Sequence, residues 1–403
     1  MEKKVMNRWL VVVGAILIQL ALGAIYAWSV FTPGLNAVTN NDVAIVYSYG
    51  DSTNYKAPLL GLEHEDLSQM NNELSPLRDE ISSITNKIKE TEDEAMISSL
   101  EKTKKGVVEK ADIIVAKYID QSTLDELKYK FSKTQTQIVF SLGLAFFAIV
   151  MVFAGRKLKS WGPGRLAILG GVVLGLGYLL SGLFGGKDFI AHALLIGVIG
   201  GAGIGLAYVV PIAVGMRWFP DKKGMITGLA VAGFGFGAML WVKLAGSWGH
   251  LIANMGMSQT FVVYGIAFAA MVIIGGIWMK WPPEGWLPKG YSPPVDDGTS
   301  KATGTKDFST AKMLRTPQFY MIFLTFVVSA GAGLMSIGLM KLYPTEALEQ
   351  AGYDAGRASI IAGTAMAVFF SLANGLGRIL WGMLSDKIGR KTSIIIMTAT
   401  QGI

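Results

Sequence analysis

An arginine lies inside an apolar stretch near the C-terminal end of the sequence. The stretch 358–384 is long enough to cross a bilayer, and Arg378 is the cation within it. The stretch centres near Phe370, so Arg378 lies about two helical turns, roughly 10 Å, from the middle. A charge at that depth costs a few kcal/mol or more unless it faces protein or water. We therefore interpret Arg378 as a functional residue, and a guanidinium that snorkels to the interface is the alternative.

Residues for enzymatic chemistry are sparse in this sequence. It has no Cys and three His, so thiolate metal sites and Cys nucleophiles are excluded. The motifs HExxH, GxSxG and GxxxxGK[ST] are absent, and GAGIG and GFGFG lie inside apolar runs with no preceding strand. We predict that the protein is not an enzyme and uses no cofactor or metal. The apolar runs also contain no Asp or Glu, which argues against an acidic proton relay within them.

The composition is that of an integral membrane protein. Of 403 residues, 51% are hydrophobic and only 16% are charged, against about 25% in soluble domains, and the mean hydropathy is +0.43. Eight apolar runs reach the roughly 20 residues that a helical span needs. They are 8–33, 134–155, 165–185, 189–217, 224–247, 259–281, 317–341 and 358–384. A ninth run begins at Thr392 and reaches the last residue, Ile403, so we expect the sequence to end inside an element.

The loops between these runs alternate in charge, which predicts the topology. The loops after spans 2, 4 and 8 are basic, whereas 185–188 and 248–259 carry few cations. We therefore predict a multi-pass protein of the plasma membrane with a cytoplasmic N-terminus. The net charge of +7 is explained by these loops, and we expect no nucleic-acid partner and a monomer in the lipid bilayer.

A charged segment, 40–130, follows the first span. It holds 18 acidic and 11 basic residues, and from Ser68 to Tyr118 its apolar residues recur at helical spacing, which predicts an amphipathic helix or a short helical hairpin. By the alternation of loops it lies outside the cell. We interpret it as a solvated cap, and a ligand-sensing or partner-binding domain is the alternative.

A proline-rich linker divides the chain into two parts. The segment 282–316 contains five prolines followed by a polar stretch, which is typical of an irregular connector. We therefore predict an N-terminal half, 1–281, that includes the 40–130 insertion, a cytoplasmic linker, 282–316, and a partial C-terminal half, 317–403.

The sequence also contains an internal repeat. Gly155–Gly162 follows the second span of the first half, and a related stretch, Gly382–Lys391, follows the second span of the other half, 227 residues later. We interpret both stretches as polar turns. Repeated halves with a substrate site between them are common in secondary transporters. Glycines four residues apart on spans 3, 4 and 5 further predict close helix packing; they are Gly171, Gly175, Gly197, Gly201, Gly205, Gly233 and Gly237.

The second copy of the repeat resembles the cytoplasmic signature of the major facilitator superfamily, G-x-L-x-D-[RK]-x-G-R-[RK]. Every defined position is met, by Gly382, Leu384, Asp386, Lys387, Gly389, Arg390 and Lys391. The first copy departs from the signature, because Lys159 stands where Asp is expected and Pro163 where Arg is expected. The resemblance implies an all-α major facilitator fold with two six-helix halves. It also implies a gating role for the signature residues, of which Asp386 and Arg390 would hold the cytoplasmic side closed, with Gly382 and Gly389 beside them.

Longer motifs resemble one family within that superfamily. They are the start NRWLVVVGAILIQLALGAIYAW, the stretch RWFPDKKGMITGLAVAGFGFG, MLRTPQFY, and the arginine eight residues before Asp386, and they resemble the oxalate:formate antiporter family. The resemblance implies that Arg378 binds the substrate carboxylate, with Tyr26 in GAIYAW and Tyr208 in GLAYVV beside it. Trp28 and Gln137 are further substrate-binding candidates on the same grounds. The family's second cationic site residue belongs to an eleventh span, which this sequence lacks.

These observations lead to one principal hypothesis and two alternatives. The principal one is a secondary transporter of small organic anions that exchanges oxalate- or formate-type carboxylates by alternating access. A carrier of pyruvate or another monocarboxylate is the alternative in the same class. A membrane receptor that senses a ligand through 40–130 is the alternative of a different class.

Overall fold

The computed structural model describes most of the chain. Its described residues are 5–32, 35, 46, 60–91, 93–127, 131–246, 248–292, 309–339, 347–348, 350–351, 361 and 365–401. Parts of several predicted segments lie outside this set, among them most of 40–59 in the insertion, 293–308 in the linker, and the start of the eighth span.

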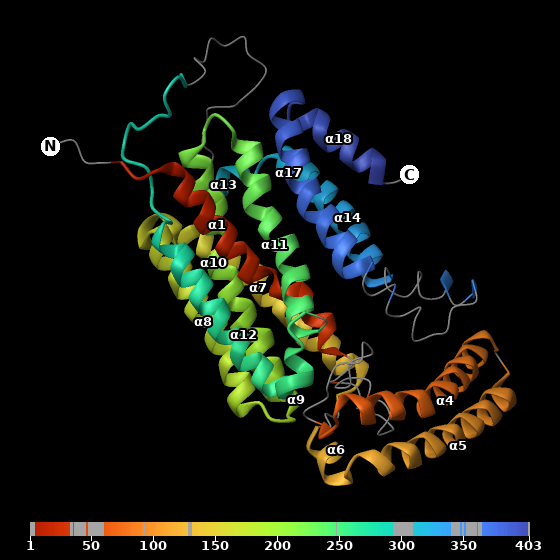
Figure 1. Cartoon of the computed structure of the whole chain (residues 1–403). Coiled ribbons are helices and arrows are strands. Elements are labelled where there is room, and N and C mark those ends of the chain that lie inside the picture. Colours follow the sequence, from red (N-terminus) through yellow and green to blue (C-terminus); the bar gives the residue numbers. More distant parts are fainter. Residues whose placement is uncertain are drawn as a thin grey trace.

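Six helices of the first half are long and apolar enough to cross a membrane. They are α1 (Arg8–Leu22) with the 3₁₀ helix η1 (Gly23–Val30), α7 (Lys133–Trp161), α8 (Pro163–Phe184), the continuous run of α9 (Phe189–His192), the π-helix η3 (Ala193–Gly200) and α10 (Gly201–Trp218), α11 (Lys223–Ala245), and α12 (Leu251–Ile277). They form one bundle (Figure 1). The prediction of an all-α membrane protein is confirmed.

Local sequence determines where these helices begin. The Asn7 side chain accepts a hydrogen bond from the backbone N–H of Trp9, which caps α1. The Ser132 hydroxyl accepts from the backbone N–H of Gln135, and the Gln135 side chain accepts from the N–H of Ser132, so α7 begins with a capping box. Pro163 occupies the first turn of α8, where its missing N–H costs no hydrogen bond.

The helices pack through their glycines, as the spacing on spans 3, 4 and 5 predicts. A Cβ atom added to Gly201 would lie 2.5 Å from the carbonyl oxygen of Gly143 on α7, and one added to Gly205 would lie 2.6 Å from that of Phe147. A Cβ atom added to Gly175 on α8 would lie 2.6 Å from the Cβ of Ala269 on α12. Because only hydrogen fits at these positions, the helix backbones approach closely enough for dense van der Waals contact.

The second half contributes further helices, of which one packs extensively on the first half. They are α13 (Thr310–Met313), α14 (Pro317–Leu339), the π-helix η4 (Met366–Phe370), α17 (Ser371–Ile388) and α18 (Arg390–Gln401). The main contact between the halves joins α17 to α11 along most of their length (Figure 1). The Gln401 side chain also donates to the backbone carbonyl of Ser329, which links α18 to α14.

The prediction that both copies of the repeat are polar turns is wrong for most of their length. The residues from Gly155 to Trp161 are helical and form the end of α7, and those from Gly382 to Ile388 form the end of α17. Each helix ends at a single glycine with positive φ: Gly162 has φ 82° and ψ 146°, and Gly389 has φ 84° and ψ 157°. Lys and Arg are good helix formers, so charge alone does not end a helix, whereas these glycines adopt a conformation that side chains disfavour.

The insertion forms a hairpin of two long helices, α4 (His64–Glu90) and α5 (Glu94–Tyr118), followed by the short α6 (Gln121–Leu127). It extends from the end of the bundle opposite to the N-terminus (Figure 1). The two helices bury one apolar face each, made of Leu67, Met70, Leu74, Val107, Ala111 and Val115. The Tyr118 hydroxyl donates to a Glu73 oxygen at 2.7 Å, and Lys117 pairs with the other oxygen at 3.3 Å. These two bonds lower the pKa of the Glu73 carboxyl, and the hydrogen bond from Tyr118 has the larger effect.

The α11–α17 contact predicts an asymmetric effect of adding one methyl group. At Gly228 a Cβ would overlap the backbone carbonyl of Arg378, whereas at Gly377 it would meet nothing within 4 Å. We expect Gly228→Ala to lower the free energy of unfolding by about 1–3 kcal/mol through overpacking. Gly377→Ala should leave it unchanged or slightly raised, because Ala favours the helix. Thermal unfolding in detergent measures both, and equal melting of the two variants would contradict the close approach.

Candidate functional site

Arg378 lies on α17, on the side of that helix that packs against the first half. Its side chain is half-buried, and its Nε donates to Oδ1 of Asn374, one turn earlier, at 2.8 Å. The guanidinium interacts electrostatically with the phenol groups of both Tyr26 and Tyr208. Three of the predicted substrate-binding residues are therefore near one another, although they come from η1, α10 and α17.

The two tyrosines belong to an aromatic cluster drawn from four helices. The Tyr26 ring packs edge-on against Phe234 of α11 with centroids 4.9 Å apart. The Tyr208 ring packs edge-on against Phe147 of α7 at 5.0 Å and against Phe234 at 5.5 Å. Offset and edge-on contacts of this kind stabilise each pair by about 0.5–1.5 kcal/mol beyond their buried area. The cluster fixes the rings, so the hydroxyls have defined positions within electrostatic range of Arg378.

A buried glutamine supports this cluster from α1. Gln19 is fully buried, and its Nε2 donates to the backbone carbonyl of Tyr208 at 3.3 Å. Its Oε1 is buried without a hydrogen-bond partner among the described residues. Sequence reasoning missed Gln19, Phe147, Phe234 and Asn374. A polar residue in the middle of an apolar run was the available signal for Gln19 and Asn374, whereas nothing distinguishes the two phenylalanines from lipid-facing ones.

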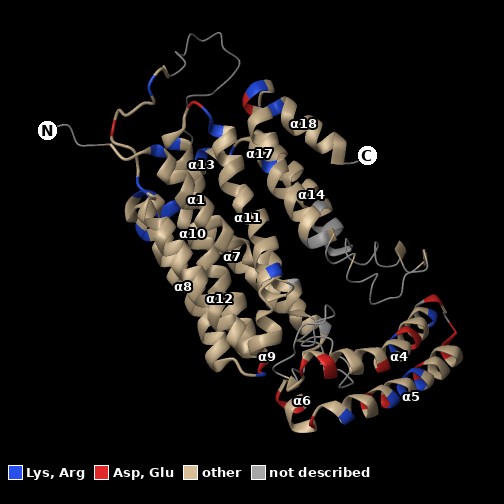
Figure 2. Ribbon diagram, in the orientation of Figure 1, with Lys and Arg blue, Asp and Glu red and all other residues tan. Residues whose placement is uncertain are grey.

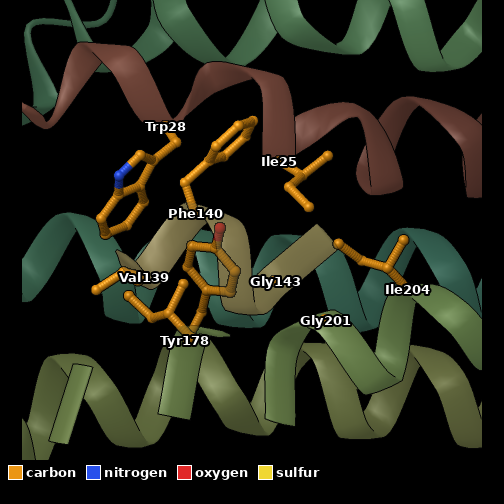
Figure 3. Close-up of a pocket in the computed structure, with 9 residues that line it drawn as sticks. Ile25, Trp28, Val139, Phe140, Gly143, Tyr178, Gly201 and Ile204 are labelled. Carbon is orange, nitrogen blue, oxygen red and sulfur yellow. The ribbon is translucent and has the colours of Figure 1, made fainter. Parts of the chain in front are cut away.

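The other two candidates lie apart from this group. Trp28 is buried, its indole Nε1 donates to the backbone carbonyl of Thr136 at 3.0 Å, and its ring stacks on Phe261. It lines a small apolar cavity of about 10 Å³ with the Tyr178 ring, room for roughly one water molecule. Figure 3 shows Trp28 and Tyr178 around this space, with Ile25 beside them. Gln137 is exposed near the start of α7, and no contact between described residues links it to Arg378.

The signature residues connect the two halves at the C-terminal end of α17. Asp386 accepts hydrogen bonds from the backbone N–H groups of Gly224 and Met225, both at 2.9 Å. These are free N–H groups of the first turn of α11, so an acid from the second half caps a helix of the first half. Arg390 donates to Asp386 at 2.6 Å and also bonds to Ser385. Gly382 lies against Gly224 with no room for a Cβ at either position.

This end of the bundle is also fastened within the first half. Arg8 forms an ion pair with Asp221 at 3.1 Å, and its guanidinium lies 4.4 Å from the ring centroid of Phe219. The Trp218 indole donates to the carbonyl of Lys280 at 2.7 Å. The basic loops that the sequence predicts on one side of the membrane therefore meet at one end of the bundle, at which α1 begins and α10 ends.

The arrangement is suited to binding rather than to covalent chemistry. A guanidinium forms bidentate hydrogen bonds with a planar carboxylate and stays charged, and the phenol hydroxyls beside it are further donors. Among the described residues no group of three or more His, Asp and Glu is close enough to hold a metal ion.

Comparison with known proteins identifies the family. The model of the Major Facilitator Superfamily matches residues 113–403. The chain is 28% identical over 272 residues to an uncharacterized MFS-type transporter of Escherichia coli (strain K12), YhjX. The aligned region covers 67% of the chain and 62% of the relative. It is 25% identical over 268 residues to the oxalate:formate antiporter of Oxalobacter formigenes, which covers 66% of the chain and 58% of the relative.

A third relative carries a different substrate name. The chain is 24% identical over 310 residues to the apicoplast pyruvate carrier 1 of Toxoplasma gondii, with 65% of the chain and 55% of the relative covered. The matches thus span 55–62% of the length of these three relatives. All three carry transporter names, in agreement with the prediction that the protein is not an enzyme.

The cap on α11 leads to a prediction about this end of the bundle. Asp386→Ala leaves two N–H groups of Gly224 and Met225 without their charged acceptor. We expect the variant to be destabilised by about 1.5–3 kcal/mol, the range for hydrogen bonds to a charged group. Lys387→Ala, at the exposed neighbouring position, should unfold as the wild type does. Thermal unfolding in detergent compares the two, and an unaffected Asp386→Ala protein would mean that the cap does not hold the halves together.

Proposed function

The chain belongs to the Major Facilitator Superfamily, and from this premise we propose that it is a secondary transporter of small carboxylate anions. The observation that carries the proposal is the position of Arg378, on the contact between the halves and within electrostatic range of Tyr26 and Tyr208. Transporters built from repeated halves bind their substrates between the halves. Arg378 would bind the carboxylate, and the two tyrosine hydroxyls would donate to its oxygens.

The electrostatics of the spans favour an anionic substrate. The eight apolar runs contain no Asp or Glu to neutralise Arg378, and Asn374, its hydrogen-bond partner, is neutral. An uncompensated guanidinium inside a span is costly, and a bound carboxylate removes that cost. Trp28 and Gln137 remain candidates from the resemblance, although no contact between described residues joins either of them to Arg378.

The contacts of Asp386 and Arg390 favour alternating access. Asp386 caps α11 and pairs with Arg390 at one end of the α11–α17 contact. With Gly382 against Gly224, and Gly389 ending α17, these residues would close one entrance while the other is open. Rocking of one half against the other would break the cap, open this entrance and close the opposite one.

For the substrate we favour exchange of oxalate- or formate-type carboxylates. The similarity to an oxalate:formate antiporter supports this choice, and the similarity to a pyruvate carrier supports a monocarboxylate such as pyruvate as the alternative. A monocarboxylate would balance the single guanidinium charge of Arg378, whereas a dicarboxylate carries one more negative charge than Arg378 can neutralise.

The charge distribution supports an orientation. The end of the bundle with Arg8, Asp221 and Arg390 carries the basic loops, so we place it, the N-terminus and the 282–316 linker in the cytoplasm of a cell with this protein in its plasma membrane. The α4–α5 hairpin, at the opposite end, would then be extracellular. We propose a monomer in the bilayer that needs no nucleic-acid partner.

The carboxylate-binding role of Arg378 is tested by two substitutions in the chain. Arg378→Gln removes the charge and should abolish carboxylate transport and the tight binding at this site, while membrane insertion persists because burial becomes less costly. Arg378→Lys keeps the charge but loses the planar fork, so binding should weaken markedly. Lys110→Gln, which changes an exposed cation on α5 outside the bundle, is the control.

The measurements are thermal stabilisation by oxalate, formate and pyruvate, and counterflow of the same labelled anions in liposomes. If Arg378→Gln binds and exchanges carboxylate as the wild type does, Arg378 is structural and the assignment of the site is wrong.

The hairpin gives a prediction that separates a transporter from a receptor. Replacing residues 40–130 with a short Gly/Ser linker should leave transport within a few-fold of the wild type, because α4 and α5 bury their apolar faces against each other. Counterflow in liposomes measures the effect. Complete loss of transport in a correctly inserted deletion would instead support a ligand-sensing role for this segment.

A further inference from the structure

A crevice opens at the basic end of the bundle, between the ends of α7 and α10 and the start of α11. It has a volume of about 490 Å³ and eight lining residues. Three of them are the cations Lys159, Arg217 and Lys223, and none is acidic. Figure 2 shows Lys and Arg gathered at this end of the bundle.

These three charges converge although their mutual repulsion opposes it. Asp221, four residues after Arg217, forms its ion pair with Arg8 and does not line the crevice. The Arg217 guanidinium lies 4.1 Å from the ring centroid of Trp281, which also lines the crevice and holds the arginine in place. Like charges that face one space are stabilised when an anion occupies it.

The internal repeat sharpens this point. In the second copy, the fifth position is Asp386, which caps α11 and neutralises Arg390. In the first copy, the same position is Lys159, which faces the crevice with Arg217. The first copy therefore adds a positive charge where the second copy supplies a negative one, so this end of the first half attracts anions.

The crevice shares its helices with the aromatic cluster. Phe147, Tyr208 and Phe234 come from α7, α10 and α11, the three helices that carry the crevice cations. Lys159, Arg217 and Lys223 are nine to twelve residues away along these helices, a rise of about 14–18 Å. An anion in the crevice would thus be held at the basic end of the bundle, at that distance along the helices from the aromatic cluster.

We propose that this crevice is a second anion site, which captures the small carboxylate substrate at the basic end before it reaches Arg378 or after it leaves. The inference rests on the proposed transport of carboxylates. Lys159 and Lys223 supply point charges, and Arg217, held on Trp281, supplies a planar fork. The field of such a cluster raises the local concentration of carboxylate at the entrance.

Equilibrium binding of labelled oxalate to the whole chain in detergent tests the site. The Arg378→Gln variant should retain a weaker, salt-sensitive class of binding. Adding Lys159→Gln and Lys223→Gln to that variant should raise its dissociation constant about three- to tenfold. Raising the ionic strength from about 0.01 M to about 1 M should have a similar effect, since the Debye length falls from about 30 Å to about 3 Å.

The matched control changes the same number of charges at the same end of α7. Arg156 and Lys157 do not line the crevice, and Lys157 instead lies 5.9 Å from the ring centroid of Phe153. Arg156→Gln with Lys157→Gln, in the Arg378→Gln background, should leave the dissociation constant unchanged. An equal loss of binding in this control would overturn the proposal, because the effect would then be one of net charge.

Two further outcomes are decisive. If a short-chain phosphatidylglycerol displaces oxalate from the Arg378→Gln variant at concentrations well below those of oxalate itself, the crevice is a lipid headgroup site and the capture of substrate is refuted. If Arg378→Gln retains full oxalate binding that the crevice substitutions remove, the crevice site stands and the role of Arg378 in the proposed function fails.

Discussion

The architecture depends on a close approach between α11 and α17, where only glycine fits. Gly224 and Gly228 on α11 face Gly382 and the backbone of Arg378 on α17 without space for a methyl group. This approach has two consequences. At one end it brings the first N–H groups of α11 within hydrogen-bond distance of Asp386. In the middle it holds Arg378 against the first half, within electrostatic range of Tyr26 and Tyr208.

The cost of the guanidinium is the second constraint. A charge inside a span needs polar surroundings, and the protein supplies Asn374 and the phenols, which are neutral. The aromatic cluster prevents these groups from rearranging, because Phe234 contacts the rings of both tyrosines. One charge with neutral donors and aromatic neighbours fits the anion site that we propose. The crevice with Lys159 and Arg217 extends the same electrostatic character to the basic end.

The repeat shows how one sequence pattern serves two different ends. Gly162 and Gly389 end their helices with nearly the same backbone conformation, φ 82° and 84°, so the local geometry of the two copies is shared. Their chemistry differs, because Asp386 caps a helix across the contact between the halves, whereas Lys159 lines an open crevice. The glycine is needed for the turn in both copies, and the charged position is free to change with its surroundings.

The sequence by itself determined the membrane class and the positions of the first six spans, and it singled out Arg378 as a charge inside a span. Apolar length and a charge inside an apolar run are properties of a single helix, so they can be read without the tertiary structure. It misjudged where α7 and α17 end, since helices continue through basic residues until a glycine stops them. The signature motif identified Asp386, but not that its partners are N–H groups of Gly224 and Met225. Only the tertiary structure decided which residues surround Arg378, because Tyr26, Phe147, Tyr208 and Phe234 come from four helices whose relative rotation depends on glycine packing.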